Sequence, residues 1–314
     1  MFDLITIGRC GVDIYPLQTG VGLAHVETFG KFLGGSPTNV AVAATRHGLR
    51  SAVVTAVGAD PFGEWVRQAI RSFGVDDAFV GTVAGPPTPV TFCEIFPPDH
   101  FPIYFYRGEH PPDLQLTADS LDLAAIGEAK VFWFTGTGLS QEPSRSAHAA
   151  ALSARTSGWT VFDLDYRPML WESPESAERE VRQALRHANV AVGNLDEVEV
   201  AVGTRDPESA AQALLDAGME VAIVKMGPGG VLARSKDEHV VVPPVKIEVV
   251  NGLGAGDAFG GAVCHGLVRG WSLERTVRFA NAAGAHVAAR LACADAMPST
   301  DEVLALLDGG EVRP

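Results

Sequence analysis

The sequence predicts an α/β fold in which a mostly parallel central sheet lies between layers of helices. Three observations lead to this prediction. Apolar runs of strand length alternate with longer helical patterns, most of these runs show no apolar/polar alternation, and no internal repeat interrupts the order. Runs that are apolar on both faces suit parallel strands covered by helices on both sides. The repeated strand–helix order therefore indicates a doubly wound α/β domain.

Six apolar runs have the length of buried strands. They cover residues 3–8, 52–58, 131–135, 160–164, 190–193 and 221–225. Helices are expected between and after these strands, and two of them have clear starts. Ser173-Pro174 and Asp206-Pro207 each place an N-cap residue before a proline at the first helical position, where the missing N–H costs nothing. The helices are expected over residues 38–48, 62–73, 144–157, 174–187, 207–217, 257–269 and 273–291.

Two segments with β character break this alternation. Residues 12–33 carry strand-like pieces between glycines, and residues 89–107 contain two aromatic-rich arms that meet at the turn Pro97-Pro98-Asp99-His100. The second segment therefore reads as a hairpin. We expect a single domain over residues 1–314, with these two segments forming a small β lid over a site at the edge of the sheet. An ordinary edge hairpin is the alternative.

The charge balance limits the possible partners. The chain of 314 residues has 24 Lys and Arg against 38 Asp and Glu, so its net charge is 24 − 38 = −14. With no long basic cluster, a nucleic-acid or anionic-membrane surface is not expected. The four cysteines form no Cys-x-x-Cys pair and the first residues do not resemble a signal peptide, so we expect reduced thiols in a cytoplasmic protein.

The most informative stretch is the glycine-rich segment 251–262. Its glycines allow the backbone amides of Gly254, Ala255 and Gly256 to converge on an anion, and a helix is expected to begin near Asp257. An anion hole beside a carboxylate suits phosphoryl transfer to an alcohol, with Asp257 as the base. A tight loop leading into a packed helix is the purely structural alternative. The spacing of the glycines matches neither a Rossmann fingerprint nor a Walker A motif.

Four segments in order resemble the PfkB/ribokinase family of sugar kinases. Residues 254–259 (Gly-Ala-Gly-Asp-Ala-Phe) match the family's C-terminal signature, and residues 34–39 match its N-terminal Gly-Gly-x-x-x-Asn element. Residues 194–197 fit its Asn-x-x-Glu motif, and residues 224–230 fit its nucleotide loop. The resemblance covers the whole chain and implies a ribokinase-like three-layer α/β/α sandwich with a β lid.

The resemblance also implies roles for single residues. Asp257 would be the catalytic base, and the amides of Gly254, Ala255 and Gly256 would form the anion hole. ATP and Mg²⁺ are the implied cofactors, with Glu197 acting on Mg²⁺ through water. The remaining nucleotide contacts would come from Asn194, Lys225, Gly227, Gly230 and Asn281. The sugar hydroxyls would be held by Asp13, Gly34, Gly35 and Asn39.

In one place the chain departs from the family pattern. The signature often opens with Asp-Thr shortly before its first glycine, whereas this chain has Asn251-Gly252-Leu253. A monovalent-cation site that depends on that acid is therefore not implied. The chemistry expected of Asp257 does not depend on it.

Other segments resemble a narrower group within the family, the 5-dehydro-2-deoxygluconokinases of inositol catabolism. These segments are residues 7–16, 31–37, 163–171 and 293–298. The implied substrate is a sugar acid, and a carboxylate on so acidic a protein needs local cations. Lys31, Arg107 and Arg167 lie beside the expected sugar site, and Arg167 follows a strand end, where α/β sheets bind their ligands.

Several alternatives stay open. The same argument for acid recognition fits a 2-keto-3-deoxygluconate kinase, and the wider family includes fructokinases and ribokinases. A non-catalytic sugar or nucleotide sensor on this fold would not need Asp257. Asp163 and Asp165 could suggest paired carboxylates for glycoside cleavage; we expect them to face opposite sides of the strand, which disfavours that interpretation. The resemblance also implies a homodimer formed through the lid.

Overall fold

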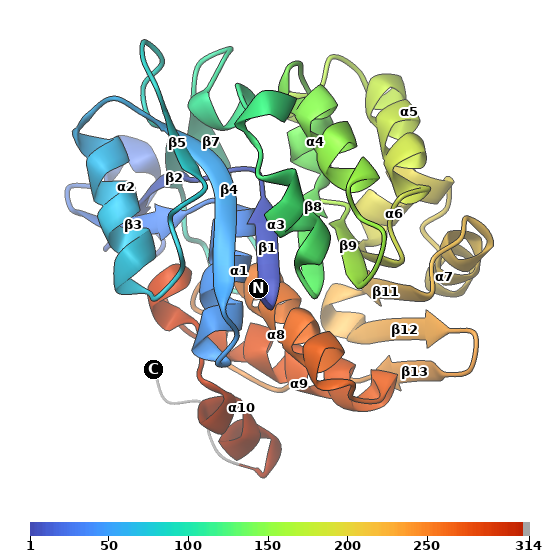
Figure 1. Cartoon of the computed structure of the whole chain (residues 1–314). Helices are drawn as coiled ribbons and strands as arrows, with labels where there is room; N and C mark the ends of the chain where they lie inside the picture. The colour runs from blue at the N-terminus through green and yellow to red at the C-terminus, as the bar shows by residue number, and fades with distance from the viewer. Residues whose placement is uncertain (310–314) are drawn as a thin grey trace.

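The central sheet has nine strands in the order β13-β12-β11-β10-β9-β8-β1-β4-β5 (Figure 1). The computed structural model describes residues 1–309. Every pairing from β11 to β5 is parallel, whereas β12 and β13 are antiparallel additions at one edge. The strands are β1 Leu4–Ile7, β4 Ser51–Gly58, β5 Val80–Val83, β8 Val131–Thr135, β9 Trp159–Asp163, β10 Val190–Asn194, β11 Val221–Lys225, β12 Val231–Ser235 and β13 His239–Val242.

Helices cover both faces of this sheet, and a hydrophobic core lies between the sheet and each layer of helices. One core packs α1, α2, α8, α9 and α10 against one face, and the other packs α3 to α7 against the opposite face. Strands such as β1, β4 and β8 are buried along their whole length because both faces are covered. The helices are α1 Ser36–Arg46, α2 Pro61–Ser72, α3 Leu123–Glu128, α4 Ser144–Ser153, α5 Pro174–Leu185, α6 Leu195–Val202, α7 Pro207–Asp216, α8 Ala255–Arg269, α9 Leu273–Ala288 and α10 Thr300–Leu307.

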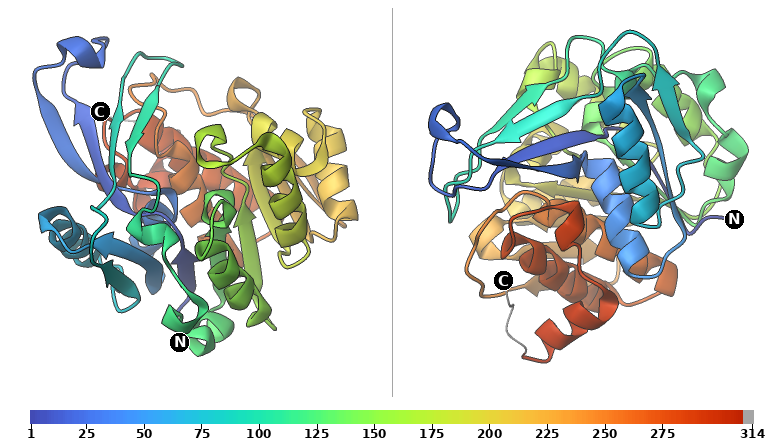
Figure 2. Two further views of the ribbon diagram at one scale, coloured as in Figure 1. Left: turned by 90° about the horizontal axis from the view of Figure 1, so that it is seen from above. Right: turned by 90° about the vertical axis from the view of Figure 1, so that its left-hand side faces the viewer.

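A second sheet of four strands extends away from the helices (Figure 2). Its order is β3-β2-β6-β7, and its strands are β2 Gly11–Pro16, β3 Phe29–Gly34, β6 Val90–Cys93 and β7 Ile103–Tyr106. Since β2 follows β1 after a short turn, this sheet starts at the carboxyl edge of the central sheet. The expected hairpin is confirmed, because β6 and β7 are antiparallel with Cys93 opposite Ile103.

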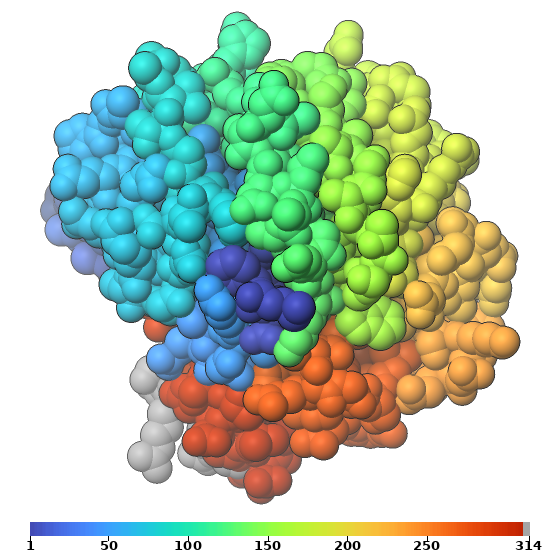
Figure 3. Space-filling view, viewed as in Figure 1, coloured from blue at the N-terminus to red at the C-terminus, as the bar shows by residue number. Residues whose placement is uncertain are grey.

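The α/β class and the three-layer arrangement are confirmed. Each of the six expected strands and seven expected helices is present, with ends that differ by a few residues. Six elements were not expected from the sequence, namely β5, β12, β13, α3, α6 and α10. In the space-filling view, the first residues of the chain (dark blue) lie between green and orange segments, so distant parts of the sequence share this face (Figure 3). Over residues 1–309, no helix is long and apolar enough to cross a membrane.

Candidate active site

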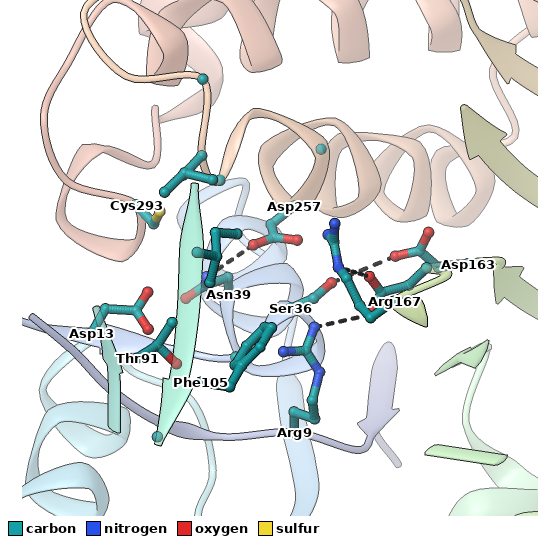
Figure 4. A pocket seen from close by; sticks show the side chains of 18 of the residues that line it. Arg9, Asp13, Ser36, Asn39, Thr91, Phe105, Asp163, Arg167, Asp257 and Cys293 are labelled. Carbon is teal, nitrogen blue, oxygen red and sulfur yellow. Dashed lines mark hydrogen bonds and ion pairs between the residues drawn. The ribbon is translucent and has the colours of Figure 1, made fainter. Parts of the chain in front are cut away.

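A cavity of about 410 Å³ lies where the second sheet meets the carboxyl ends of the parallel strands. It is lined by residues that follow β1, β9, β10 and β11, by the start of α1 and by the start of α8 (Figure 4). The carboxyl ends of parallel strands are the usual ligand-binding edge of an open α/β sheet. Both expected ligand regions, for sugar and for nucleotide, therefore open into one cavity.

The glycine-rich segment supplies the amino end of α8 to this cavity. Gly254 precedes the helix with φ 83°, and a Cβ on it would lie 2.6 Å from Cys293 Sγ, so only glycine fits. The N–H groups of Ala255 and Gly256 belong to the first helical turn, which has no acceptor of its own. Unpaired amides at a helix amino end attract an anion. The local structure is therefore compatible with the anion hole expected here.

Asp257 lies at this helix start and faces α1. Asn39 Nδ2 donates a 2.9 Å hydrogen bond to Asp257 Oδ2. Burial raises the pKa of the Asp257 carboxyl above its ordinary value of 3.8, although the hydrogen bonds from Asn39 and Ser36 oppose that shift. A raised pKa makes a carboxylate a stronger proton acceptor. The position suits a general base next to an anion hole.

The expected nucleotide residues lie at the ends of neighbouring strands. Asn194 and Lys225 are paired in register at the carboxyl ends of β10 and β11. The Lys225 ammonium lies 3.6 Å from the place that a Cβ on Gly256 would take, so it is close to the anion hole. Burial alone would lower the pKa of Lys225, but the carboxylates of Glu197 and others raise it. A cation held charged at this position suits phosphate binding.

Asn194 and Glu197 also start helix α6. Asn194 Oδ1 accepts the N–H of Glu197 at 3.0 Å, and Glu197 Oε2 accepts the N–H of Asn194 at 2.7 Å. This reciprocal pair is a capping box. The cap uses Asn194 Oδ1 and one oxygen of Glu197, so the second carboxylate oxygen of Glu197 is available for another ligand.

On the sugar side, Asp13 extends from β2 into the cavity. Tyr15 Oη donates a 2.8 Å hydrogen bond to Asp13 Oδ2, and Tyr15 Oη also lies 2.9 Å from Cys293 Sγ. Burial raises the pKa of Asp13 to about 6. A Cβ on Gly34, the cross-strand neighbour of Gly11, would collide with the Asp13 carboxylate. The glycine at position 34 therefore leaves room for the acid.

Across the cavity from Asp13, two arginines form ion pairs with the same carboxylate, that of Asp165. Arg9 Nη2 lies 3.0 Å from Asp165 Oδ2, and Arg167 Nε lies 3.0 Å from Asp165 Oδ1. Burial would raise the pKa of Asp165, but Arg167 and Arg9 lower it to about 2. Asp165 has φ 26°, an unusual conformation for a residue other than glycine. Such strain persists where the surrounding contacts impose it.

Most predicted site residues line the cavity. These are Asp13, Gly35, Asn39, Arg107, Arg167, Asn194, Glu197, Lys225, Gly227, Gly254, Gly256 and Asp257. Arg107 is buried, but its guanidinium is held 2.8 Å from the Asp113 carboxylate. This ion pair reduces what Arg107 can offer to a ligand.

Five predicted residues lie outside the lining, as far as residues 1–309 show. Gly34, Ala255 and Gly230 are adjacent to lining residues or to the loop that bears them. Asn281 donates to the Pro243 carbonyl at 2.8 Å. Lys31 is exposed and its ammonium lies over the Trp65 ring at 4.2 Å, so its expected place beside the sugar is wrong in this structure.

The cavity also contains residues that the sequence analysis did not assign, above all Arg9, Ser36, Asp163 and Asp165. The prediction that Asp163 and Asp165 face opposite sides is wrong, since both line the cavity. Residues two apart share a face of a strand, and β9 ends at Asp163. Burial raises the pKa of Asp163 well above its ordinary value, with Lys225 opposing this shift. The sequence feature that could have placed Asp163 and Asp165 in the site is their position at the carboxyl end of a predicted strand.

The fold is that of a phosphotransferase of the ribokinase-like type, and a buried carboxylate, the unpaired amides of a helix start and a second acid lie in one cavity, as expected for such an enzyme. The comparison with known families agrees: residues 1–300 match the pfkB family carbohydrate kinase model. The chain belongs to this family, and it is a carbohydrate kinase.

Relatives and solved structures extend this result. The 5-dehydro-2-deoxygluconokinase of Listeria monocytogenes serotype 4b is 32% identical over 317 residues, which cover 99% of this chain and 97% of that protein. The Shouchella clausii protein of the same name is 31% identical, with 98% and 96% covered. A fructokinase with bound ATP from Xylella fastidiosa has a TM-score of 0.86 at 23% identity, with 98% and 99% covered. An E. coli protein solved as Ribokinase II with ATP and Mg²⁺ has a TM-score of 0.90 at 23% identity, with 98% and 100% covered. These structures establish the shared fold.

Proposed function

We propose that this carbohydrate kinase transfers the γ-phosphoryl group of ATP to a hydroxyl of 5-dehydro-2-deoxygluconate and releases its 6-phosphate. The observation that carries the chemistry is the buried Asp257 carboxylate at the amino end of α8, hydrogen-bonded to Asn39 at 2.9 Å. The observation that carries the substrate class is the pair of arginines around Asp165. The relatives that bear this enzyme's name match nearly the whole chain.

In the proposed reaction, Asp257 accepts the proton of the sugar hydroxyl while the hydroxyl oxygen attacks the γ-phosphorus. The bond between that phosphorus and the β–γ bridging oxygen breaks, and ADP leaves. The N–H groups of Ala255 and Gly256 stabilise the negative charge of the transferred group. Lys225 holds the nucleotide phosphates. Asp13 accepts hydrogen bonds from sugar hydroxyls and orients the reacting one.

The residues also fit Mg²⁺ bound mainly through water and phosphate. Magnesium ions in such sites use only one or two carboxylates and retain several waters. The free oxygen of Glu197 meets that need, and the described residues contain no group of three or more His, Cys, Asp or Glu that would bind an ion directly. When bound, Mg²⁺ would neutralise charge on the phosphates.

The lid, the homodimer and the cellular location belong to the same proposal. The second sheet would close as a lid over the sugar and exclude water, and its strands would pair two subunits into a homodimer. Its outer side carries exposed Tyr104 and Tyr106, which supports such a contact. A cytoplasmic location remains a prediction from the reduced cysteines, all four of which are buried and free.

A second candidate substrate is 2-keto-3-deoxygluconate, because its carboxylate would meet the same two arginines. The test is an ADP-release screen over 5-dehydro-2-deoxygluconate, 2-keto-3-deoxygluconate, fructose, ribose and adenosine. We expect the highest kcat/KM on 5-dehydro-2-deoxygluconate. Highest turnover on a neutral sugar would refute the sugar-acid proposal and leave the kinase class intact.

A further inference from the structure

Arg9 is the arginine of this pair to which the family motifs assign no role, and it lines the cavity beside Asp165. It follows β1, and it is only 8% exposed although it carries a charge. A buried charge is costly unless it is paired, so each partner of this guanidinium is informative. Figure 4 shows Arg9 beside Phe105 and pointing across the cavity floor toward the segment that bears Arg167.

The contacts of Arg9 fix one edge of its guanidinium. Nη2 lies 3.0 Å from Asp165 Oδ2, Nε donates to Thr137 Oγ1 at 3.2 Å, and the guanidinium carbon lies 5.4 Å from the Phe105 ring centre. Thr137 Oγ1 in turn donates to Asp165 Oδ2 at 3.2 Å. These contacts use Nε and Nη2, and within residues 1–309 no hydrogen bond of Nη1 is found.

Arg167 reaches the same carboxylate from the other side, through Nε and Asp165 Oδ1. Asp165 thus holds one guanidinium on each of its oxygens. Asp165 by itself balances one of the two guanidinium charges, and the carboxyl groups of Asp163, Glu197 and Asp257 line the same cavity. Guanidinium groups hold carboxylates well because their N–H groups match the two oxygens.

We propose that Arg9 determines specificity for a sugar acid by binding the substrate carboxylate together with Arg167, while Asp165 orients both side chains. This inference rests on the proposed sugar-acid kinase activity. The substrate carboxylate accepts hydrogen bonds from the guanidinium N–H groups that Asp165 and Thr137 do not use. A neutral sugar gives these N–H groups no anionic acceptor, which is the basis of discrimination.

The test compares Arg9→Gln with a matched control, Arg50→Gln, because Arg50 is exposed and precedes β4 at the opposite end of the sheet. For Arg9→Gln we expect kcat/KM on 5-dehydro-2-deoxygluconate to fall roughly 10- to 150-fold, the range of a lost hydrogen bond to a charged group. We expect less than about a threefold change on the best neutral sugar of the screen, because that substrate makes no such contact. Arg50→Gln should match the wild type on both.

A second variant keeps the test valid if Arg9→Gln folds poorly. Arg9→Lys retains the charge but not the planar fork, and it should lose an intermediate amount on the sugar acid alone. Equal losses on acid and neutral sugars, in either variant with native circular dichroism, would mean that Arg9 acts on the phosphoryl group or on the fold, and would overturn the inference. A wild-type enzyme that prefers neutral sugars would overturn the proposed function, and the inference with it. An unchanged ratio of kcat/KM for the acid over the neutral sugar in Arg9→Gln would overturn the inference alone.

Discussion

Replacing Asp257 with asparagine tests the centre of the proposed chemistry. Asparagine has the same shape but cannot accept the hydroxyl proton. The fold around it should persist: Asn39 Nδ2 now donates to Asp257, and Asn39 Oδ1 is buried with no hydrogen bond among the described residues. After Asn39 reorients, the amide introduced at position 257 can donate to Asn39 Oδ1 and accept from Asn39 Nδ2. Loss of activity would therefore report on proton transfer.

The size of the loss follows from what the variant retains. A positioned general base contributes about 10²- to 10⁴-fold in rate, which equals about 3–5 kcal/mol at 1.36 kcal/mol for each factor of ten. The amides of Ala255 and Gly256 and the Lys225 ammonium remain, so phosphoryl charge is still stabilised. We expect kcat to fall within this range and the Kd for ATP to stay within about twofold, because the base does not contact the nucleotide.

Although Asp257→Asn should lower kcat, it should raise the free energy of unfolding at neutral pH. Because burial raises the pKa of Asp257, the folded state binds its proton more tightly than the unfolded state, and stability contributed by this group falls as pH rises through the two pKa values. At pH 7 the ionised carboxylate is therefore a cost that asparagine removes. We expect a higher Tm for Asp257→Asn at pH 7, and a smaller gain as pH falls toward 4.

The assay is coupled ADP release at saturating ATP and sugar, with calorimetry for ATP binding and thermal unfolding at both pH values. Asp119→Asn is the matched control, because this acid is exposed and lies outside the cavity. A kcat within threefold of the wild type would refute Asp257 as the base. A lower Tm with equal losses in ATP binding and kcat would point to a folding defect instead.

Three further predictions follow from the site. Gly254→Ala should lower the free energy of unfolding by about 1–2 kcal/mol and reduce kcat, because the φ of Gly254 is 83° and a Cβ there would meet Cys293 Sγ at 2.6 Å. Gly218→Ala is the control for backbone strain, since Gly218 has φ 108° and open space around its Cβ position. Equal losses of turnover in both variants would contradict a role for the collision with Cys293. The KM for sugar should rise as pH falls below about 6, because protonated Asp13 accepts fewer hydrogen bonds. A KM that stays constant from pH 5 to 8 in the wild type would refute this prediction. In the control variant Asp13→Asn, the KM should not depend on pH over this range. Lys225→Gln should raise the KM for ATP by roughly 10- to 150-fold with little effect on the KM for sugar, as initial rates would show; an effect confined to sugar would contradict the nucleotide role.

The sequence alone predicted the central sheet because its strands are apolar on both faces, a pattern that needs no knowledge of neighbours. It missed α6 because β10 runs into that helix with no loop between them, and Asn194 is both the last strand residue and the N-cap. It missed β12 and β13 because they add to the sheet in the antiparallel sense, beside β11 and outside the strand–helix alternation. These elements follow from local connections that hydrophobic periodicity does not report.

The site was predictable where the backbone itself is the functional group. Glycines at positions 254 and 256 permit an unusual backbone conformation and a close approach of a ligand to the backbone. The spacing of glycines in the sequence is enough to indicate both. Arg9 and Asp165 carry no such signal, since 156 residues separate them in the chain and only the parallel order of β1, β8 and β9 brings them together. Charge arithmetic required cations near the substrate but could not choose among them.

The position of Lys31 shows what makes that choice. In the pairing of β2 with β3, Asp13 lies opposite Phe32 and Ile14 lies opposite Lys31. Directly opposite residues in an antiparallel pair share a face, and successive residues alternate between faces. Since Asp13 faces the cavity, Lys31 must face away from it, where its ammonium packs over Trp65 of α2. Arg9 and Arg167 instead follow the carboxyl ends of parallel strands, so the sheet delivers both guanidiniums to the same edge. Strand register, more than net charge, therefore decides which cations can bind the substrate.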